Sequence, residues 1–142
     1  MLFRSSHAYI PLLAQLIKVF ADGLPASEVK RLFRQAGRGL ADELFAAHRP
    51  SGTLRAKVNL ASRLMNEQLG AITHVEENGS YVIRGAGCPL AALTGKHPAV
   101  CLAMESMLAD LLETPVRECC ERSGRPRCCF EVKGAPLRRA RG

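Results

Sequence analysis

Apolar residues recur every three or four positions along the first half of the chain, which gathers them on one face of a helix. This spacing predicts three helices, over about residues 8–21, 25–47 and 53–69. Asp22-Gly23 and Gly70 follow the first and third helices, where glycine suits the left-handed backbone after a helix end. Gly37 and Gly39 interrupt the second helix at a cost of about 1 kcal/mol each relative to alanine. Close packing against another helix could offset that cost.

The pattern changes after residue 70 from helical spacing to alternation. Residues 71–85 alternate apolar and polar side chains around Asn78-Gly79, which is typical of a β-hairpin with a two-residue type I′ turn. Such a turn gives the cross-strand pairs Val75–Val82 and His74–Ile83. This segment is therefore predicted to be the first hairpin.

The remaining elements are a loop, a helix and a second hairpin. They are predicted at residues 85–95 for the loop, 98–112 for the helix, and 115–121 and 127–133 for the strands. The fold class is α+β: three N-terminal helices, then an antiparallel sheet of about four strands, with one helix between the two hairpins and the helices on one side. We expect one domain over residues 1–133, followed by a basic flexible tail at 134–142 that is rich in Gly, Pro, Ala and Arg.

The charge and hydropathy of the chain restrict its partners. The net charge is +7, but much of the excess lies in the tail and around the last predicted turn. Two Tyr and five Phe are too few and too scattered for a base-stacking platform, so direct DNA binding by this chain is not favoured. No apolar run of about 18 residues occurs, and the N-terminus lacks a signal-peptide cleavage site. We expect a cytoplasmic protein whose thiols stay reduced.

All six cysteines lie within 42 residues, from Cys88 to Cys129, and none precedes them. The absence of a C-x-x-C motif excludes zinc-ribbon and thioredoxin-like sites. Cys101 falls in the first turn of the fourth helix, where the helix dipole favours a thiolate. Cys120 and Cys128 flank the predicted turn closely enough to share one ion. Four separate elements could thus each offer one thiolate to zinc or to an iron–sulfur cluster.

Each doublet, Cys119-Cys120 and Cys128-Cys129, is expected to offer only one thiol, because neighbours in a strand point to opposite faces. This argument leaves open which thiol of each doublet binds. Six reduced cysteines packed in an apolar core are the alternative to a metal site. His97 is either a further ligand or a loop residue before the fourth helix, and the acidic residues near it in sequence form no convergent pair for acid–base catalysis.

The cysteine spacing is similar to a known family. The pattern comprises Cys88-Pro89, His97-Pro98-x-x-Cys101 and Cys120-x-x-x-Gly124-x-x-x-Cys128-x-Phe130. It resembles the C-terminal sensor domain of winged-helix, ArsR-like bacterial transcriptional regulators, a group that includes the repressors of iron–sulfur cluster assembly. Its last part is also similar to the related 4-vinyl-reductase domain. The resemblance covers about residues 8–133.

The resemblance implies that Cys88, Cys101, Cys120 and Cys128 occupy the ligand positions of the family. Such cysteines hold an iron–sulfur cluster in the repressors, and zinc beside a small-molecule pocket in the vinyl-reductase-like domains. The interval from Cys101 to the third cysteine is longer here than in the repressors, and the interval to the fourth is shorter. Residues 2–4 resemble the last strand of the family's wing, so DNA would be contacted only through a winged-helix part absent here.

The sequence thus predicts a metal- or iron–sulfur-binding regulatory sensor domain and not an enzyme. We expect it to form a homodimer through its long helices and to have no membrane association. The alternative is a 4-vinyl-reductase-like module that binds a small molecule and carries a structural zinc. Its pocket would be lined by apolar residues of the second and third helices.

Overall fold

A computed structural model describes residues 6–46, 49–88, 90–94, 96–120 and 127–133 of the chain. The predicted basic tail, the wing-like residues 2–4 and the turn of the second hairpin lie outside the described residues. The helices are α1 (Ser6–Gly23), α2 (Ala26–Phe45), α3 (Leu54–Leu69), α4 (Ala91–Thr94) and α5 (Cys101–Leu112), with a 3-10 turn η2 (Pro98–Val100) leading into α5. The strands are β1 (Thr73–Glu77), β2 (Tyr81–Gly85), β3 (Val116–Glu118) and β4 (Cys129–Val132). The predicted α+β fold is confirmed, and α4 adds one helical turn within the predicted loop at 85–95.

Local signals fix the ends of α3, which bring the chain into the first hairpin. The Thr53 hydroxyl accepts a hydrogen bond from the Ala56 N–H at 3.1 Å, which satisfies one of the unpaired donors at the start of the helix. Gly70 ends the helix with φ +72° and donates its N–H to the Met65 carbonyl oxygen. These caps explain why the predicted and observed bounds of α3 agree.

The four strands form one antiparallel sheet in the order β1-β2-β4-β3. The predicted register of the first hairpin is wrong by one residue, because the pairs are Val75–Ile83 and His74–Arg84. The turn holds three residues, 78–80, with Gly79 at φ +80°. A three-residue turn with a left-handed residue is a common alternative to the two-residue Asn-Gly turn. The last two strands are also shorter than predicted, with Cys119 and Cys120 just after β3 and Cys128 just before β4.

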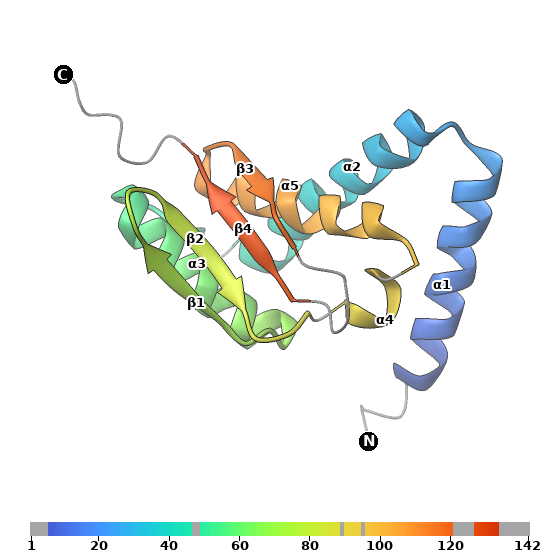
Figure 1. Cartoon of the computed structure of the whole chain (residues 1–142), viewed down its shortest axis with the longest axis horizontal. Coiled ribbons are helices and arrows are strands. Elements are labelled where there is room, and N and C mark those ends of the chain that lie inside the picture. Colours follow the sequence, from blue (N-terminus) through green and yellow to red (C-terminus); the bar gives the residue numbers. More distant parts are fainter. Residues whose placement is uncertain (1–5, 47–48, 89, 95, 121–126, 134–142) are drawn as a thin grey trace.

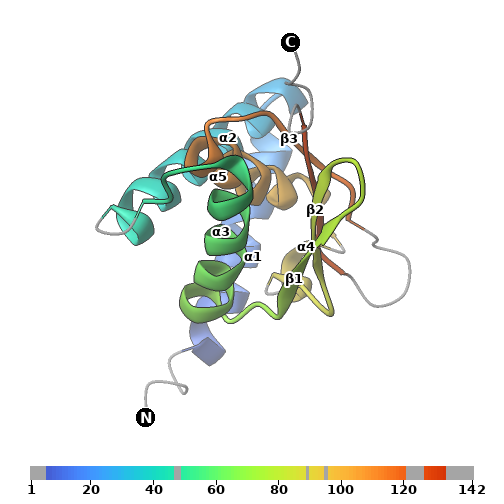
Figure 2. The same ribbon diagram turned by 90° about the vertical axis from the view of Figure 1, so that its left-hand side faces the viewer.

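The helices cover one face of the sheet. Figure 2 shows the sheet nearly edge-on, with α2, α3 and α5 all to one side of it. In the core, α5 packs against both α2 and β3, and α3 packs against β1. Phe45, Met65, Met107 and Phe130 are fully buried between these layers. Helix α1 stands at the edge of this assembly and contacts α2 and α4 (Figure 1).

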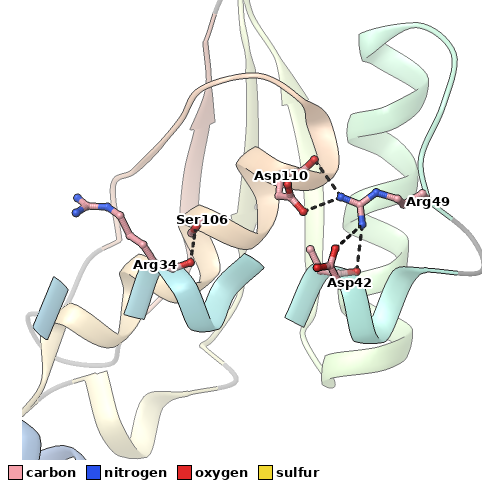
Figure 3. Close-up of polar contacts among 6 residues, drawn as sticks. Arg34, Asp42, Arg49, Ser106 and Asp110 are labelled. Atoms are coloured by element: carbon pink, nitrogen blue, oxygen red, sulfur yellow. Dashed lines mark hydrogen bonds and ion pairs between the residues drawn. The ribbon is translucent and has the colours of Figure 1, made fainter. Parts of the chain in front are cut away.

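Polar contacts join α2 and the residues after it to α5 (Figure 3). The Ser106 hydroxyl donates to the Arg34 carbonyl oxygen at 2.8 Å. The Arg49 guanidinium lies between two carboxylates, 2.6 Å from that of Asp110 and 3.5 Å from that of Asp42. These contacts hold α5 along α2, and α5 begins with Cys101.

Candidate metal centre

Four cysteines that are not in disulfide bonds come from four places in the fold. Cys88 follows β2, Cys101 is the first residue of α5, Cys120 follows β3 and Cys128 precedes β4. Cys101 and Cys128 are buried, and Cys88 and Cys120 are half-buried. The four are the residues that the sequence singles out as ligands, and they are brought together only by the tertiary fold.

The tightest group of ligand atoms combines two thiols with a carboxylate. The sulfurs of Cys101 and Cys120 and a carboxylate oxygen of Glu118 all lie within 4.8 Å of one another. Glu118 and Cys120 are two residues apart on an extended segment, so both side chains face the helix layer where Cys101 lies. Glu118 also accepts the Cys120 N–H at 2.7 Å, which fixes the carboxylate beside the thiols. This group has the donors and the spacing to hold a metal ion.

Glu118 is not among the ligands predicted from the sequence, where the acidic residues are considered only as pairs suited to acid–base catalysis. A usable signal exists: Glu118 lies two positions before Cys120, the spacing that places both on one face of a strand. The Glu105 carboxylate adds a second acidic group nearby by accepting the Glu118 N–H at 2.8 Å. His97 lies just before η2 and is not part of the group.

A second pair of thiols is formed by Cys88 and Cys128, which hydrogen-bond to each other. The Cys128 carbonyl oxygen accepts the Gly85 N–H at 2.8 Å, and its N–H donates to the Gly87 carbonyl oxygen at 3.3 Å. Glycine at position 85 favours this approach, because a Cβ there would lie 2.8 Å from the Gly87 carbonyl oxygen and 3.0 Å from the Cys128 Cβ. The Cys88 sulfur also lies 4.0 Å from the hydroxyl oxygen of the buried Thr94.

The thiols perturb one another's protonation. The hydrogen bond with the Cys101 thiol, together with burial, raises the pKa of Cys120 well above its usual range. The hydrogen bond with Cys88 and burial likewise raise the pKa of Cys128, and the charge on Cys101 adds to the effect. Without a cation, thiolates this close to one another are disfavoured. Because the Cys101 charge acts on Cys128, the two thiol pairs are neighbours. In the described part of the chain, however, Cys88 and Cys128 do not belong to the group of ligand atoms that lie within 4.8 Å of one another.

The remaining two cysteines, Cys119 and Cys129, form a disulfide bond. The expectation that all thiols are reduced is therefore wrong for these two. They lie opposite each other just beyond the β3–β4 ladder, with their Cα atoms 4.9 Å apart and the Cys119 N–H donating to the Cys129 carbonyl oxygen at 2.7 Å. The bond uses one member of each doublet and leaves Cys120 and Cys128 as thiols.

An apolar cavity of about 210 Å³ lies between α1 and α2. Its lining comprises Leu13, Ile17, Phe20, Val29, Leu32, Phe33 and Ala36. The pocket predicted from the sequence lies between the second and third helices, whereas this cavity is formed by the first and second.

The fold and the site define an α+β domain with a cysteine-rich candidate metal centre. In comparisons with known proteins, no family model matches the chain and no curated protein is significantly similar to it. The likeness to winged-helix regulators therefore stays a prediction from the cysteine motif. None of the helices in the described part of the chain has the length and apolar character that a membrane crossing needs.

Proposed function

We propose that this chain is a cytoplasmic regulatory sensor domain that binds zinc or an iron–sulfur cluster through Cys88, Cys101, Cys120 and Cys128. The observation that carries the proposal is the convergence of Cys101, Glu118 and Cys120 from two separate elements into one group of ligand atoms. In this proposal the thiols are ligands and not catalytic nucleophiles.

The donor chemistry fits these metals. Thiolate sulfur selects zinc and iron–sulfur clusters, whereas calcium and magnesium prefer oxygen ligands. Four cysteines can surround one zinc ion, or they can hold a cluster, and two neighbouring thiol pairs suit a [2Fe–2S] arrangement in which each iron takes two thiolates. Because the pKa values of Cys120 and Cys128 are raised in the metal-free protein, metal binding would release protons from the centre.

The positions of the ligands suggest how metal binding would be transmitted. Ligation would tie the N-terminus of α5 and the segment after β2 to the β3–β4 edge of the sheet. Helix α5 lies against α2, and α2 lies against α1. Loss of the metal would free the start of α5 and shift this helical layer, which is a two-state response to a bound ligand.

The proposal includes a homodimer formed through α1. One face of this helix, with Leu13, Ile17 and Phe20, lines the cavity against α2. Another stripe, spaced at helical intervals, is exposed to solvent and contains Tyr9, Leu12, Leu16 and Val19. The two sets form one broad apolar band on α1, and the part of it that α2 does not cover is available for a partner. DNA would then be contacted by a winged-helix part joined to this dimer, and not by the sensor domain.

The direct test is metal analysis of protein purified without oxygen. A brown sample with absorption near about 400 nm and stoichiometric iron and sulfide would indicate a cluster, since thiolate-bound iron–sulfur centres are coloured. Cys101→Ser should then lose the metal, whereas Met104→Leu on the same helix should keep it, because that core substitution conserves volume. Purified protein that contains no metal and takes up neither zinc nor a reconstituted cluster would refute the proposal.

A second candidate is favoured by the apolar cavity between α1 and α2. It is a small-molecule-binding module of the vinyl-reductase type in which zinc is structural. The sample would then be colourless with one zinc per chain, and an apolar ligand would raise the melting temperature. Phe33→Asp, which places a carboxylate on the cavity wall, should remove that ligand effect without removing the zinc.

A further inference from the structure

The Cys119–Cys129 disulfide lies next to the candidate metal centre along both strands. Each of its cysteines directly adjoins a proposed ligand, Cys120 on one side and Cys128 on the other. The Cys129 carbonyl oxygen accepts the Cys119 N–H at 2.7 Å and lies 3.7 Å from the Cys120 sulfur. Movement of Cys129 is thus transmitted to Cys120 through the backbone.

In the described part of the chain, the disulfide and the Cys119–Cys129 backbone hydrogen bond join the two strands at the end where Cys120 and Cys128 lie. The β3–β4 ladder comprises three residue pairs and ends at Glu118–Phe130. Beyond that pair, the disulfide is a covalent tie between the two strands at the end where both ligands lie. Breaking it would give the β3 side of this end, which carries Cys120, greater freedom, whereas Cys128 and Cys129 stay held against β2.

The disulfide also adjoins a small basic cavity of about 110 Å³. Arg84 and Arg127 line this cavity together with Cys129, and Arg84 is the cross-strand partner of Cys129 in the sheet. The Arg84 Nε donates to a Glu76 carboxylate oxygen at 3.1 Å, which orients the guanidinium along the sheet. Glu76 already pairs with Arg84, so the attraction for an anionic partner beside the disulfide rests mainly on Arg127, because arginine pairs well with carboxylates.

We propose that Cys119–Cys129 is a thiol–disulfide exchange site for an anionic low-molecular-weight thiol, and that its reduction weakens the metal centre. This inference rests on the proposed function, whose site it would regulate. The thiolate of the small molecule attacks the Cys129 sulfur from the basic cavity, the S–S bond breaks, and Cys119 leaves as a thiolate.

A second molecule of the same thiol then attacks the sulfur of the first. A small-molecule disulfide forms, and Cys129 leaves as a thiolate. Two thiols have supplied the two electrons that reduce the protein disulfide, and both protein thiolates take protons from water. The reverse reaction, with the small-molecule disulfide as oxidant, restores the Cys119–Cys129 bond.

The exchange step can be tested without any metal. Metal-free protein is incubated with glutathione, which is anionic, or with cysteamine, which is cationic, at equal thiolate concentrations, and peptide mass mapping follows the loss of the Cys119–Cys129 bond. Glutathione should react faster with the wild-type chain, and Arg127→Ala should remove most of that preference. Lys133→Ala removes an exposed positive charge outside the cavity and should keep it. If the wild type and Arg127→Ala prefer glutathione over cysteamine to the same extent, the assigned role of the basic cavity is overturned.

The regulatory step is tested by zinc titration against a chromophoric chelator. The oxidised protein is compared with protein that has been reduced and then freed of reductant by gel filtration without oxygen. The reduced form should bind zinc about 10- to 100-fold more weakly, the range typical of lost support around a metal site. The double variant Cys119→Ser/Cys129→Ser should bind zinc as weakly as the reduced wild type, with or without prior reduction. If that variant does not fold, the comparison of oxidised and reduced wild type is sufficient to test the regulatory step.

Two other outcomes are informative. Equal zinc affinity in the oxidised and reduced wild type would overturn this inference and leave the proposed metal centre standing. Absence of zinc binding in both forms would overturn the proposed function, and the inference with it.

Discussion

Gly37 of α2 lies directly against the carbonyl oxygen of Ala103 in α5, two residues after Cys101. A Cβ at position 37 would overlap that oxygen and would lie 2.9 Å from the Ser106 Cβ. Gly39 has nothing within 4 Å of the corresponding position. Close helix packing therefore accounts for the first glycine of α2 but not for the second.

Gly37→Ala should consequently destabilise the protein, although alanine is the better helix former. Overpacking at a helix crossing typically costs about 1–3 kcal/mol, which exceeds the gain of about 1 kcal/mol in helix propensity. Gly39→Ala is the matched control, and it should raise the free energy of unfolding by up to about 1 kcal/mol. Urea unfolding of the two variants checks this, and a stabilised Gly37→Ala would contradict the close crossing.

Glu118 should contribute to metal binding through its charge. Glu118→Gln keeps an oxygen that can accept the Cys120 N–H but removes the negative charge beside the Cys101 and Cys120 thiols. Zinc affinity should fall by roughly tenfold or more, as for other changes to groups that support a metal site. Glu131→Gln, on the opposite face of the sheet and paired with Arg117, should leave the affinity unchanged. A Glu118→Gln variant with wild-type affinity would remove this carboxylate from the site.

The stability of the metal-free protein should fall at alkaline pH. The pKa values of Cys120 and Cys128 are raised in the folded state, so these thiols keep their protons there. In the unfolded chain they ionise above about pH 8.5, the usual pKa of a cysteine. Above that pH the folded state binds more protons than the unfolded state, so its stability decreases as the pH rises. Below that pH both states are protonated and the contribution is complete.

The expected slope is at most about 1.4 kcal/mol per pH unit for each thiol. Denaturant unfolding at intervals from pH 7 to 10 measures it, and Cys120→Ser should make the profile shallower. Zinc-loaded protein should not show this decline, because bound metal keeps the thiolates paired in the folded state. A metal-free protein equally stable at pH 7.5 and 10 would contradict the raised pKa values.

Of the two ion pairs that Arg49 forms, the one with Asp110 in α5 should stabilise the protein more than the one with Asp42 in α2. Arg49 lies 2.6 Å from the Asp110 carboxylate but 3.5 Å from that of Asp42, whose side chain is largely exposed. Asp110→Asn should cost about 0.5–1.5 kcal/mol, the net range for a typical intramolecular hydrogen bond. Asp42→Asn should cost less than about 0.5 kcal/mol. Thermal unfolding of the two variants compares them, and equal effects would contradict the asymmetry.

Elements whose ends are set by local signals were predicted more accurately from the sequence than the pairing between strands. The end of α3 at Gly70 and the switch to alternation after it are local signals, and both are found in the structure. The register of the first hairpin was missed because Asn78-Gly79 is compatible with turns of two or three residues. Choosing between them depends on which side chains face the core, and here Val75 pairs with the buried Ile83. That choice is tertiary and is not encoded in the turn itself.

The candidate site shows the same limit. Strand alternation correctly separates the members of each cysteine doublet onto opposite faces, but it does not reveal that Cys119 and Cys129 meet across the ribbon. That meeting depends on the β3–β4 register, which a hairpin with an irregular turn does not disclose. Glu118 joins the thiols because α5 places Cys101 over the end of β3, a contact between elements that no spacing along the chain specifies.

The exposed stripe of α1 should be the dimer interface, and this can be tested at two positions on it. Leu12 and Val19 are 60% and 63% exposed and lie seven residues apart, so both are on the same face of the helix. The double substitution Leu12→Glu/Val19→Glu should convert a dimer into a monomer, because carboxylates in an apolar helix contact are costly to bury. Lys18→Glu places the same charge on α1 but off this stripe, and should leave the dimer intact.

Sedimentation velocity over a range of protein concentrations distinguishes the two variants. Neither should change the far-ultraviolet circular dichroism, since the substituted side chains are exposed in the single chain. A wild-type protein that sediments as a monomer at every concentration would exclude this interface. A double variant that stays dimeric would place the interface elsewhere and leave the exposed stripe of α1 to another partner.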